Sequence, residues 1–129
     1  MILVDTSVWV RFLANQAPFA AELDRLLLDG GGVGHEYVYG ELLLGDRGGR
    51  RALLESYAQM THASPVPHPE VVAFIRARGF HGRGIGWVDA HLLASALVAG
   101  GRLWTADRAL ATIADECGIA YRILDSTSR

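Results

Sequence analysis

Four acidic residues interrupt or directly end apolar segments of the sequence, where a charged side chain is costly. Asp5 and Asp107 follow short apolar segments, and Glu41 and Asp89 lie inside longer ones. A carboxylate in such surroundings loses solvation free energy unless an arginine, a proton or a metal ion compensates for it. Four carboxylates that converge would repel one another strongly without a cation. Hard oxygen ligands of this kind suit Mg²⁺ or Mn²⁺, so the pattern predicts a divalent-metal site.

Each of the four acids also has an ordinary structural interpretation. Asp5 and Asp89 could cap helices or lie in their first turns, and Asp107 could be a turn residue before a helix. Glu41 could be solvated on one side or paired with an arginine such as Arg47. The chain has 14 acidic residues, and the other ten lie in turns and on polar helix faces. A shared site explains four misplaced acids together better than four separate accidents do.

The elements that would position these acids alternate along the chain. Apolar runs predict strands at 2–4, 33–35, 103–104 and 120–124. Apolar periodicity, caps and glycine stops predict helices at 5–14, 18–29, 36–45, 50–60, 70–78, 87–99 and 108–117. Buried strands that alternate with helices indicate an α/β fold, a three-layer α/β/α sandwich around a mostly parallel sheet. With no repeat and no linker, residues 1–129 are expected to form a single domain.

A parallel sheet would bring several of the acids to one place. Sites in open parallel sheets form outside the carboxyl ends of the strands, and Asp5 and Asp107 each come just after a predicted strand. Asp89 falls in the first turn of its helix, where the positive end of the helix dipole favours a negative charge. Glu41 lies in mid-helix, so only the tertiary fold can bring it to the other three.

Composition restricts the partners and the location of the protein. The formal net charge is -2, so binding to a nucleic acid would depend on local basic patches. Two arginine clusters could supply them or meet an acidic protein partner: Arg47, Arg50 and Arg51, and Arg76, Arg78 and Arg83. Cys117 is the single cysteine, and neither a secretion signal nor a membrane span is expected. A cytoplasmic protein is predicted.

The acidic motifs, taken in order, resemble those of PIN domains. The segments that carry the resemblance are Asp5-Thr6-Ser7, Glu41-Leu42-Leu43-Leu44-Gly45, Trp87-Val88-Asp89-Ala90 and Leu103-Trp104-Thr105-Ala106-Asp107. Their order and spacing match the family over nearly the whole chain. The size and the single bare domain are similar to the VapC toxins of toxin–antitoxin systems.

This resemblance implies an activity and its partners. Asp5, Glu41, Asp89 and Asp107 would be both the catalytic residues and the ligands of one or two Mg²⁺ or Mn²⁺ ions. The protein would be a ribonuclease toxin that hydrolyses phosphodiester bonds in single-stranded or loop RNA and leaves a 5′-phosphate. A small cognate antitoxin would neutralise it, and the toxin would form a homodimer. The hydroxyls of Thr6, Ser7 and Thr105 would either position carboxylates or water, or serve only in caps and turns.

Three other functions compete with this one. A response-regulator receiver domain needs an acidic pair near the first strand and a lysine near the last, and the chain contains no lysine. A magnesium-dependent phosphatase of small phosphate esters would place an acid at position 7, where this chain has Ser7. A catalytically inactive PIN domain that only binds a partner would be expected to have lost acids, yet all four positions are filled.

A few other features have weaker functional interpretations. His35 is expected near the site, although a structural role suits it better, and His91 should face elsewhere on its helix. The Gly82-x-Gly84-x-Gly86 segment lacks a preceding strand and is no dinucleotide fingerprint. It is either a plain connector or a loop that brings Arg83 to RNA. Phe19, Leu23 and Leu27 form an apolar helix face that belongs either to the core or to a protein interface.

Overall fold

Three short parallel strands form the centre of the fold. In the computed structural model, which describes residues 1–123, the strand order is β2-β1-β3. The strands are β1 (Ile2–Val4), β2 (Gly32–Val33) and β3 (Arg102–Trp104). Leu3 lies opposite Val33 on one side and Leu103 on the other. Because β1 and β3 are parallel and in register, Asp5 and Thr105 leave the same edge of the sheet side by side.

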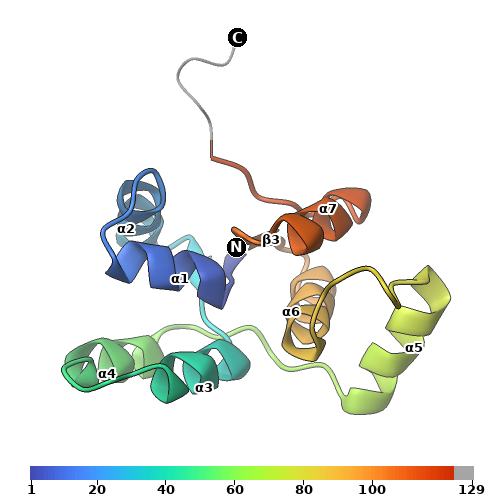
Figure 1. The fold of residues 1–129 in the computed structure, drawn as a ribbon, viewed down its shortest axis with the longest axis horizontal. Helices are drawn as coiled ribbons and strands as arrows, with labels where there is room; N and C mark the ends of the chain where they lie inside the picture. The colour runs from blue at the N-terminus through green and yellow to red at the C-terminus, as the bar shows by residue number, and fades with distance from the viewer. Residues whose placement is uncertain (124–129) are drawn as a thin grey trace, which may run out of the picture.

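Helices cover both faces of this sheet. In the described residues they are α1 (Thr6–Leu13), α2 (Phe19–Asp29), α3 (Glu36–Leu44), α4 (Arg51–Gln59), α5 (His68–Arg78), α6 (Trp87–Val98) and α7 (Arg108–Glu116). Figure 1 shows α2 and α7 on one side of the sheet and α3, α4, α5 and α6 on the other. The predicted α/β/α sandwich with a parallel sheet is confirmed. None of the helices in residues 1–123 is long and apolar enough to cross a membrane.

The core lies between the sheet and these helices. Its largest fully buried side chains include Trp9, Trp104 and Tyr57, and α6 is buried over most of its circumference. The apolar face of α2 belongs to this core, because Leu23 is fully buried and the Phe19 ring stacks on Trp104 at 6.2 Å between centroids. Of the two interpretations of that face, the structure supports the core.

The predicted last strand is wrong over its described part. Ala120 makes a single parallel bridge to Leu103, and the chain then leaves the sheet edge. The cause is Tyr121, whose ring packs on Trp104 at 5.4 Å between centroids and whose hydroxyl bonds Glu22 of α2. These contacts draw the segment toward α2. The final position of the prediction, residue 124, lies outside the described residues.

Other boundaries shift by a few residues. The second strand ends at Val33, because Gly34 turns to bond the backbone of residues 61 and 63 and His35 becomes the N-cap of α3. Helix α5 begins at His68, two residues before the predicted start, because Pro69 falls in its first turn, where proline costs no hydrogen bond.

Candidate active site

The sheet register holds Asp5 beside Thr105. The Asp5 backbone N–H donates to the Trp104 carbonyl at 2.9 Å, which extends the ladder of β1 and β3 by one residue. The Asp5 side chain is only 4% exposed, and its Oδ2 accepts hydrogen bonds from the Ser7 and Thr105 hydroxyls, each at 2.7 Å. Asp5 occupies the N-cap position of α1, yet its carboxylate caps no backbone N–H of that helix. Capping therefore does not explain this acid.

Glu41 reaches the same region from α3. Thr6, the first residue of α1, donates its hydroxyl to Glu41 Oε1 at 2.5 Å, across the contact between α1 and α3. The alternative pairing with Arg47 is not found. Among the ion pairs of the described residues, none includes any of the four acids.

Asp89 lies in the first turn of α6, as predicted. Its Oδ2 accepts a hydrogen bond from the Gly86 N–H at 2.9 Å, so the carboxylate does cap its own helix. Burial raises the pKa of Asp89 above its ordinary value, although the Gly86 hydrogen bond lowers it, and the negative charges of Asp5, Asp107 and Glu41 raise it further. The fold has therefore brought the other three acids within electrostatic range of Asp89.

Asp107 is the N-cap of α7. Its Oδ1 accepts from the backbone N–H groups of Ala109 at 2.8 Å and Leu110 at 3.4 Å. Its own backbone N–H donates to Thr105 Oγ1 at 3.0 Å, so Thr105 connects Asp107 with Asp5. The capping interpretation of Asp107 is correct, but it accounts for only one of the two carboxylate oxygens.

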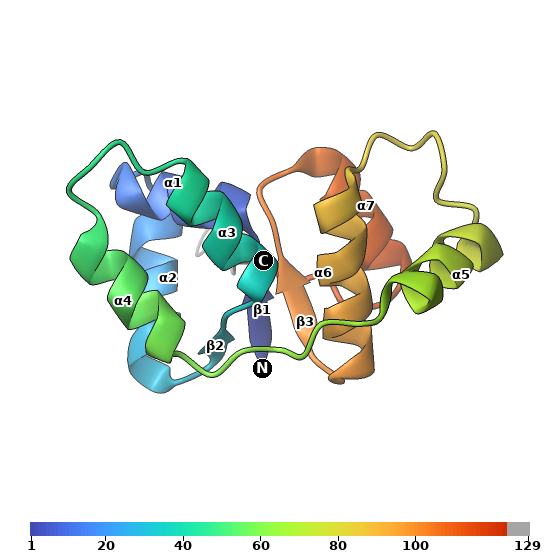
Figure 2. The same cartoon turned by 90° about the horizontal axis from the view of Figure 1, so that it is seen from below.

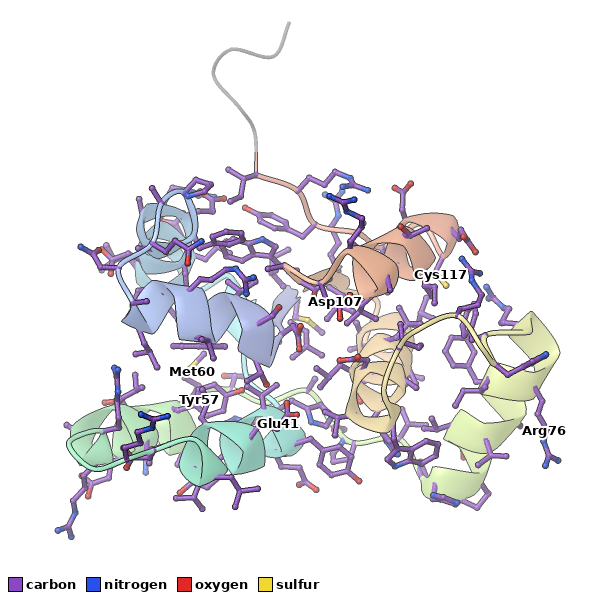
Figure 3. The ribbon with its side chains drawn as sticks, viewed as in Figure 1. Glu41, Tyr57, Met60, Arg76, Asp107 and Cys117 are labelled. Atoms are coloured by element: carbon purple, nitrogen blue, oxygen red, sulfur yellow. The ribbon has the colours of Figure 1, made fainter. Side chains whose placement is uncertain are left out.

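The same division holds for all four acids. In each, one oxygen accepts hydrogen bonds from the scaffold, while the second accepts none from residues 1–123. The held oxygens are Asp5 Oδ2, Glu41 Oε1, Asp89 Oδ2 and Asp107 Oδ1. Figure 3 shows Glu41 and Asp107 on opposite sides of the space between α1 and α6. The arrangement fixes each carboxylate and leaves it one oxygen for a ligand.

These residues fit a divalent ion in their chemistry. Asp5 is buried, Asp89 and Asp107 are partly buried, and Glu41 is exposed, so Glu41 is solvated on one side as its structural interpretation allowed. Carboxylates without a cationic partner in the described residues form a hard, anionic oxygen site. No group of three or more acidic, histidine or cysteine side chains in residues 1–123 is arranged so that it could hold a metal ion. Mg²⁺ does not require such a group, since it is usually held by one or two carboxylates and keeps several waters. An open site also leaves coordination positions for a substrate phosphate.

Other candidate residues of the sequence lie elsewhere. Arg83 forms a two-fold ion pair with Glu116 of α7 at 2.6 and 2.8 Å, which ties the glycine-rich loop to α7. A contact of Arg83 with RNA stays a prediction. Arg76 points away from the molecule at the outer side of α5 (Figure 3). His91 packs its ring between Tyr37 and Trp87.

A groove runs beside Glu41. Its volume is about 290 Å³, and it lies between α1, α3 and α4. Thr6 and Glu41 stand at one part of its wall, Leu13 and Leu53 contribute apolar surface, and Arg50 adds a positive charge. No feature of the sequence pointed to this groove, because its walls come from helices that are separate in the chain.

Comparison with known proteins agrees with the fold and the order of the acids. The sequence model of the PIN domain matches residues 2–116, and the chain belongs to this family. The chain is similar to Ribonuclease VapC32 of Mycobacterium tuberculosis, in both strains CDC 1551 / Oshkosh and ATCC 25618 / H37Rv. Identity is 43% over 121 residues, covering 93% of this chain and 95% of the relative.

A solved structure shows the same fold. The crystal structure of FitAcB from Neisseria gonorrhoeae matches with a TM-score of 0.66 and 26% identity. The match covers 89% of this chain and 94% of that chain. The family match over residues 2–116 includes the sheet and all four segments that carry the acids.

Proposed function

We propose that this protein is a divalent-metal-dependent endoribonuclease and the toxin of a toxin–antitoxin pair. The observation that carries the proposal is the group of four carboxylates, each held through one oxygen and none paired with a cation within residues 1–123. Membership of the PIN family and the identity with Ribonuclease VapC32 indicate the reaction class. A phosphatase acting on small esters would use similar acids, and the relationship to a ribonuclease favours RNA.

Some residues of the site would bind the metal, and others orient the residues that bind it. Asp5, Glu41, Asp89 and Asp107 would hold one or two Mg²⁺ or Mn²⁺ ions through their available oxygens. A bound ion lowers the pKa of water and neutralises charge on a phosphodiester. Ser7 and Thr105 fix the rotamer of Asp5, and Thr6 fixes that of Glu41. In the reaction a water oxygen joins phosphorus and the P–O3′ bond breaks, which yields a 5′-phosphate and a 3′-hydroxyl.

The partners follow from the same proposal. The substrate is RNA, cleaved in the cytoplasm, and the inhibitor is a small antitoxin. The apolar groove beside Glu41 offers a surface for an amphipathic helix of the antitoxin, since Val10 in its wall is 54% exposed. A homodimer belongs to the same proposal, and Leu44, Trp87 and Val98 are exposed apolar side chains that a second copy of the chain could cover.

The test is cleavage of a mixed pool of structured RNAs by the purified protein with Mg²⁺, with Mn²⁺ and with EDTA. We expect cleavage that requires the metal and disappears in Asp89→Asn. Asp24→Asn is the matched control, because Asp24 is an exposed acid of α2, a helix that carries none of the four acids. Cleavage that persists in Asp89→Asn or in EDTA would contradict the proposal. Release of phosphate from small esters without RNA cleavage would favour the phosphatase.

A further inference from the structure

A buried hydrogen bond connects the two helices that carry Glu41 and Asp89. His35, the N-cap of α3, is 0% exposed, and its Nδ1 accepts a hydrogen bond from the Tyr37 N–H at 3.0 Å. A neutral imidazole has one protonated nitrogen, so the hydrogen must be on Nε2. That nitrogen lies 3.0 Å from Ser95 Oγ in α6, and it therefore donates to the serine hydroxyl.

Within the described part of the chain, two side-chain contacts join α3, with its N-cap, to α6: this bond and one contact between rings. Figure 2 shows these helices side by side on one face of the sheet. The next contact along them is between the rings of Tyr37 and His91, with centroids 4.9 Å apart. Glu41 and Asp89 come next. Glu41 is six residues from His35 and Asp89 six residues from Ser95, which is about 9 Å along a helix. The two helices are antiparallel, so both acids lie on the same side of the His35–Ser95 bond.

The rest of the α3–α6 contact provides little to fix this geometry. Within residues 1–123, the His35–Ser95 bond is the one hydrogen bond that joins α3 or its N-cap to α6. Burial lowers the pKa of His35 to about 4, so the ring stays neutral and keeps one donor and one acceptor at ordinary pH. A directional bond between two groups that are both buried restricts how the helices can turn or separate.

We infer that His35 and Ser95 are positioning residues that set the separation of the Glu41 and Asp89 carboxylates by clamping α3 to α6. This inference rests on the proposed function, in which these carboxylates hold the metal. The His35–Ser95 bond then has a role beyond stability. A small rotation of α3 at His35 moves Glu41, and a small rotation of α6 at Ser95 moves Asp89. Partners that orient metal ligands typically change metal affinity or activity by about 10- to 100-fold when they are removed.

The variants Ser95→Ala and His35→Asn test the clamp. Ser95→Ala removes the acceptor with little change in volume. His35→Asn keeps an oxygen that can cap Tyr37 and loses the reach to Ser95. Tyr57→Phe is the matched control. The Tyr57 hydroxyl bonds the backbone N–H and C=O of His35, at 2.9 and 3.3 Å, within the same polar cluster but outside the α3–α6 link. Chemical denaturation checks folding and measures the stability of each variant.

The decisive measurement is Mn²⁺ binding to the full chain by titration calorimetry, followed by kcat and KM for RNA. We expect Mn²⁺ affinity and kcat to fall about 10-fold or more in Ser95→Ala and His35→Asn, with KM little changed. The double variant should bind no more weakly than either single one, because both remove the same bond. Tyr57→Phe should lose stability and keep its affinity.

The outcomes separate this inference from the proposed function. Wild-type protein that binds no Mn²⁺ and cleaves no RNA would contradict the proposed function. If Mn²⁺ binds the wild-type protein and binds folded Ser95→Ala with the same affinity, the inference about His35 and Ser95 is overturned and the proposed function is not. The same follows if all three variants lose metal affinity in proportion to their stability, since His35 and Ser95 would then act only as core residues. Ser95→Ala is the milder change and decides the matter if His35→Asn does not fold.

Discussion

Each carboxylate of the site has two oxygens, and the protein uses them differently. One oxygen of Asp89 and one of Asp107 cap helices, and one oxygen of Asp5 accepts two hydroxyl hydrogen bonds. The structural and functional interpretations of these residues are therefore compatible. A capping bond even improves a ligand, because it removes the side-chain freedom that metal binding would otherwise have to restrict.

Asp89→Asn should separate function from stability. Asparagine keeps an oxygen that can accept from the Gly86 N–H, and it removes a charge that burial and three neighbouring acids disfavour. The pKa of Asp89 is raised in the folded state, so the charged side chain destabilises the fold once the pH exceeds its unfolded value. In EDTA at pH 7 we expect the variant to melt a few degrees above wild type, yet to cleave no RNA. An unchanged or lower Tm would mean that burial and the neighbouring acids do not destabilise the charged form of Asp89.

His35 should make stability depend on pH. Burial is the main cause that lowers its pKa from 6.5 to about 4, so the unfolded chain binds a proton more readily between these values. Its contribution to stability is complete above pH 6.5 and decreases as the pH falls toward 4. Urea denaturation at pH 7, 6 and 5 should show this loss, and His35→Asn should show a smaller one. The same pH dependence in both proteins would mean that other groups cause it.

At the scale of elements, the N-terminus of α7 allows the capping role and the charge of Asp107 to be tested separately. Asp107 Oδ1 caps the helix, and asparagine caps as well as aspartate does. Asp107→Asn should therefore keep the stability of the protein and lose cleavage. Asp107→Ala should lose both, with a decrease of about 1 kcal/mol in the free energy of unfolding. Urea denaturation of the two variants distinguishes these roles, and equal stability would show that the cap contributes nothing.

The elements themselves were largely predictable because their signals are local. Helix α6 is apolar nearly all round and preceded by glycine, and α2 ends at Gly30, whose φ of 72° suits glycine. The segment after Ala120 was mispredicted as a strand, because Tyr121 bonds a helix 99 positions away in the sequence. Apolar periodicity contains no information about such a contact.

The same limit applies to the acids. Asp5 and Asp107 were predictable from the ends of strands, and Asp89 from the start of a helix. Glu41 could be recognised as misplaced, but its approach to Thr6 spans 35 positions and required the fold. The bond between His35 and Ser95 spans 60 positions, and neither residue is unusual for its local sequence.

For the whole molecule, the four acids come from segments spread over the chain, and the native fold alone brings them together. Figure 2 shows α1 to α4 on one side of β1 and α5 to α7 on the other, so the site lies where the two groups of helices meet. Glu41 belongs to the first group, and Asp89 and Asp107 to the second. A cation at this place would hold the two groups together against the repulsion of the carboxylates.

The melting temperature should therefore rise with Mn²⁺ concentration. A ligand that binds only the folded state at one hundred times its Kd stabilises the fold by about 2.7 kcal/mol. For a chain of this length that corresponds to a rise in Tm of roughly 10 °C. Asp5→Asn should show a much smaller rise, and Asp24→Asn, the surface control, the full one. Equal rises in all three proteins would mean that Mn²⁺ binds outside the four acids. A rise in wild type and Asp24→Asn alone would mean that Mn²⁺ binds the folded chain through Asp5, where the two groups of helices meet.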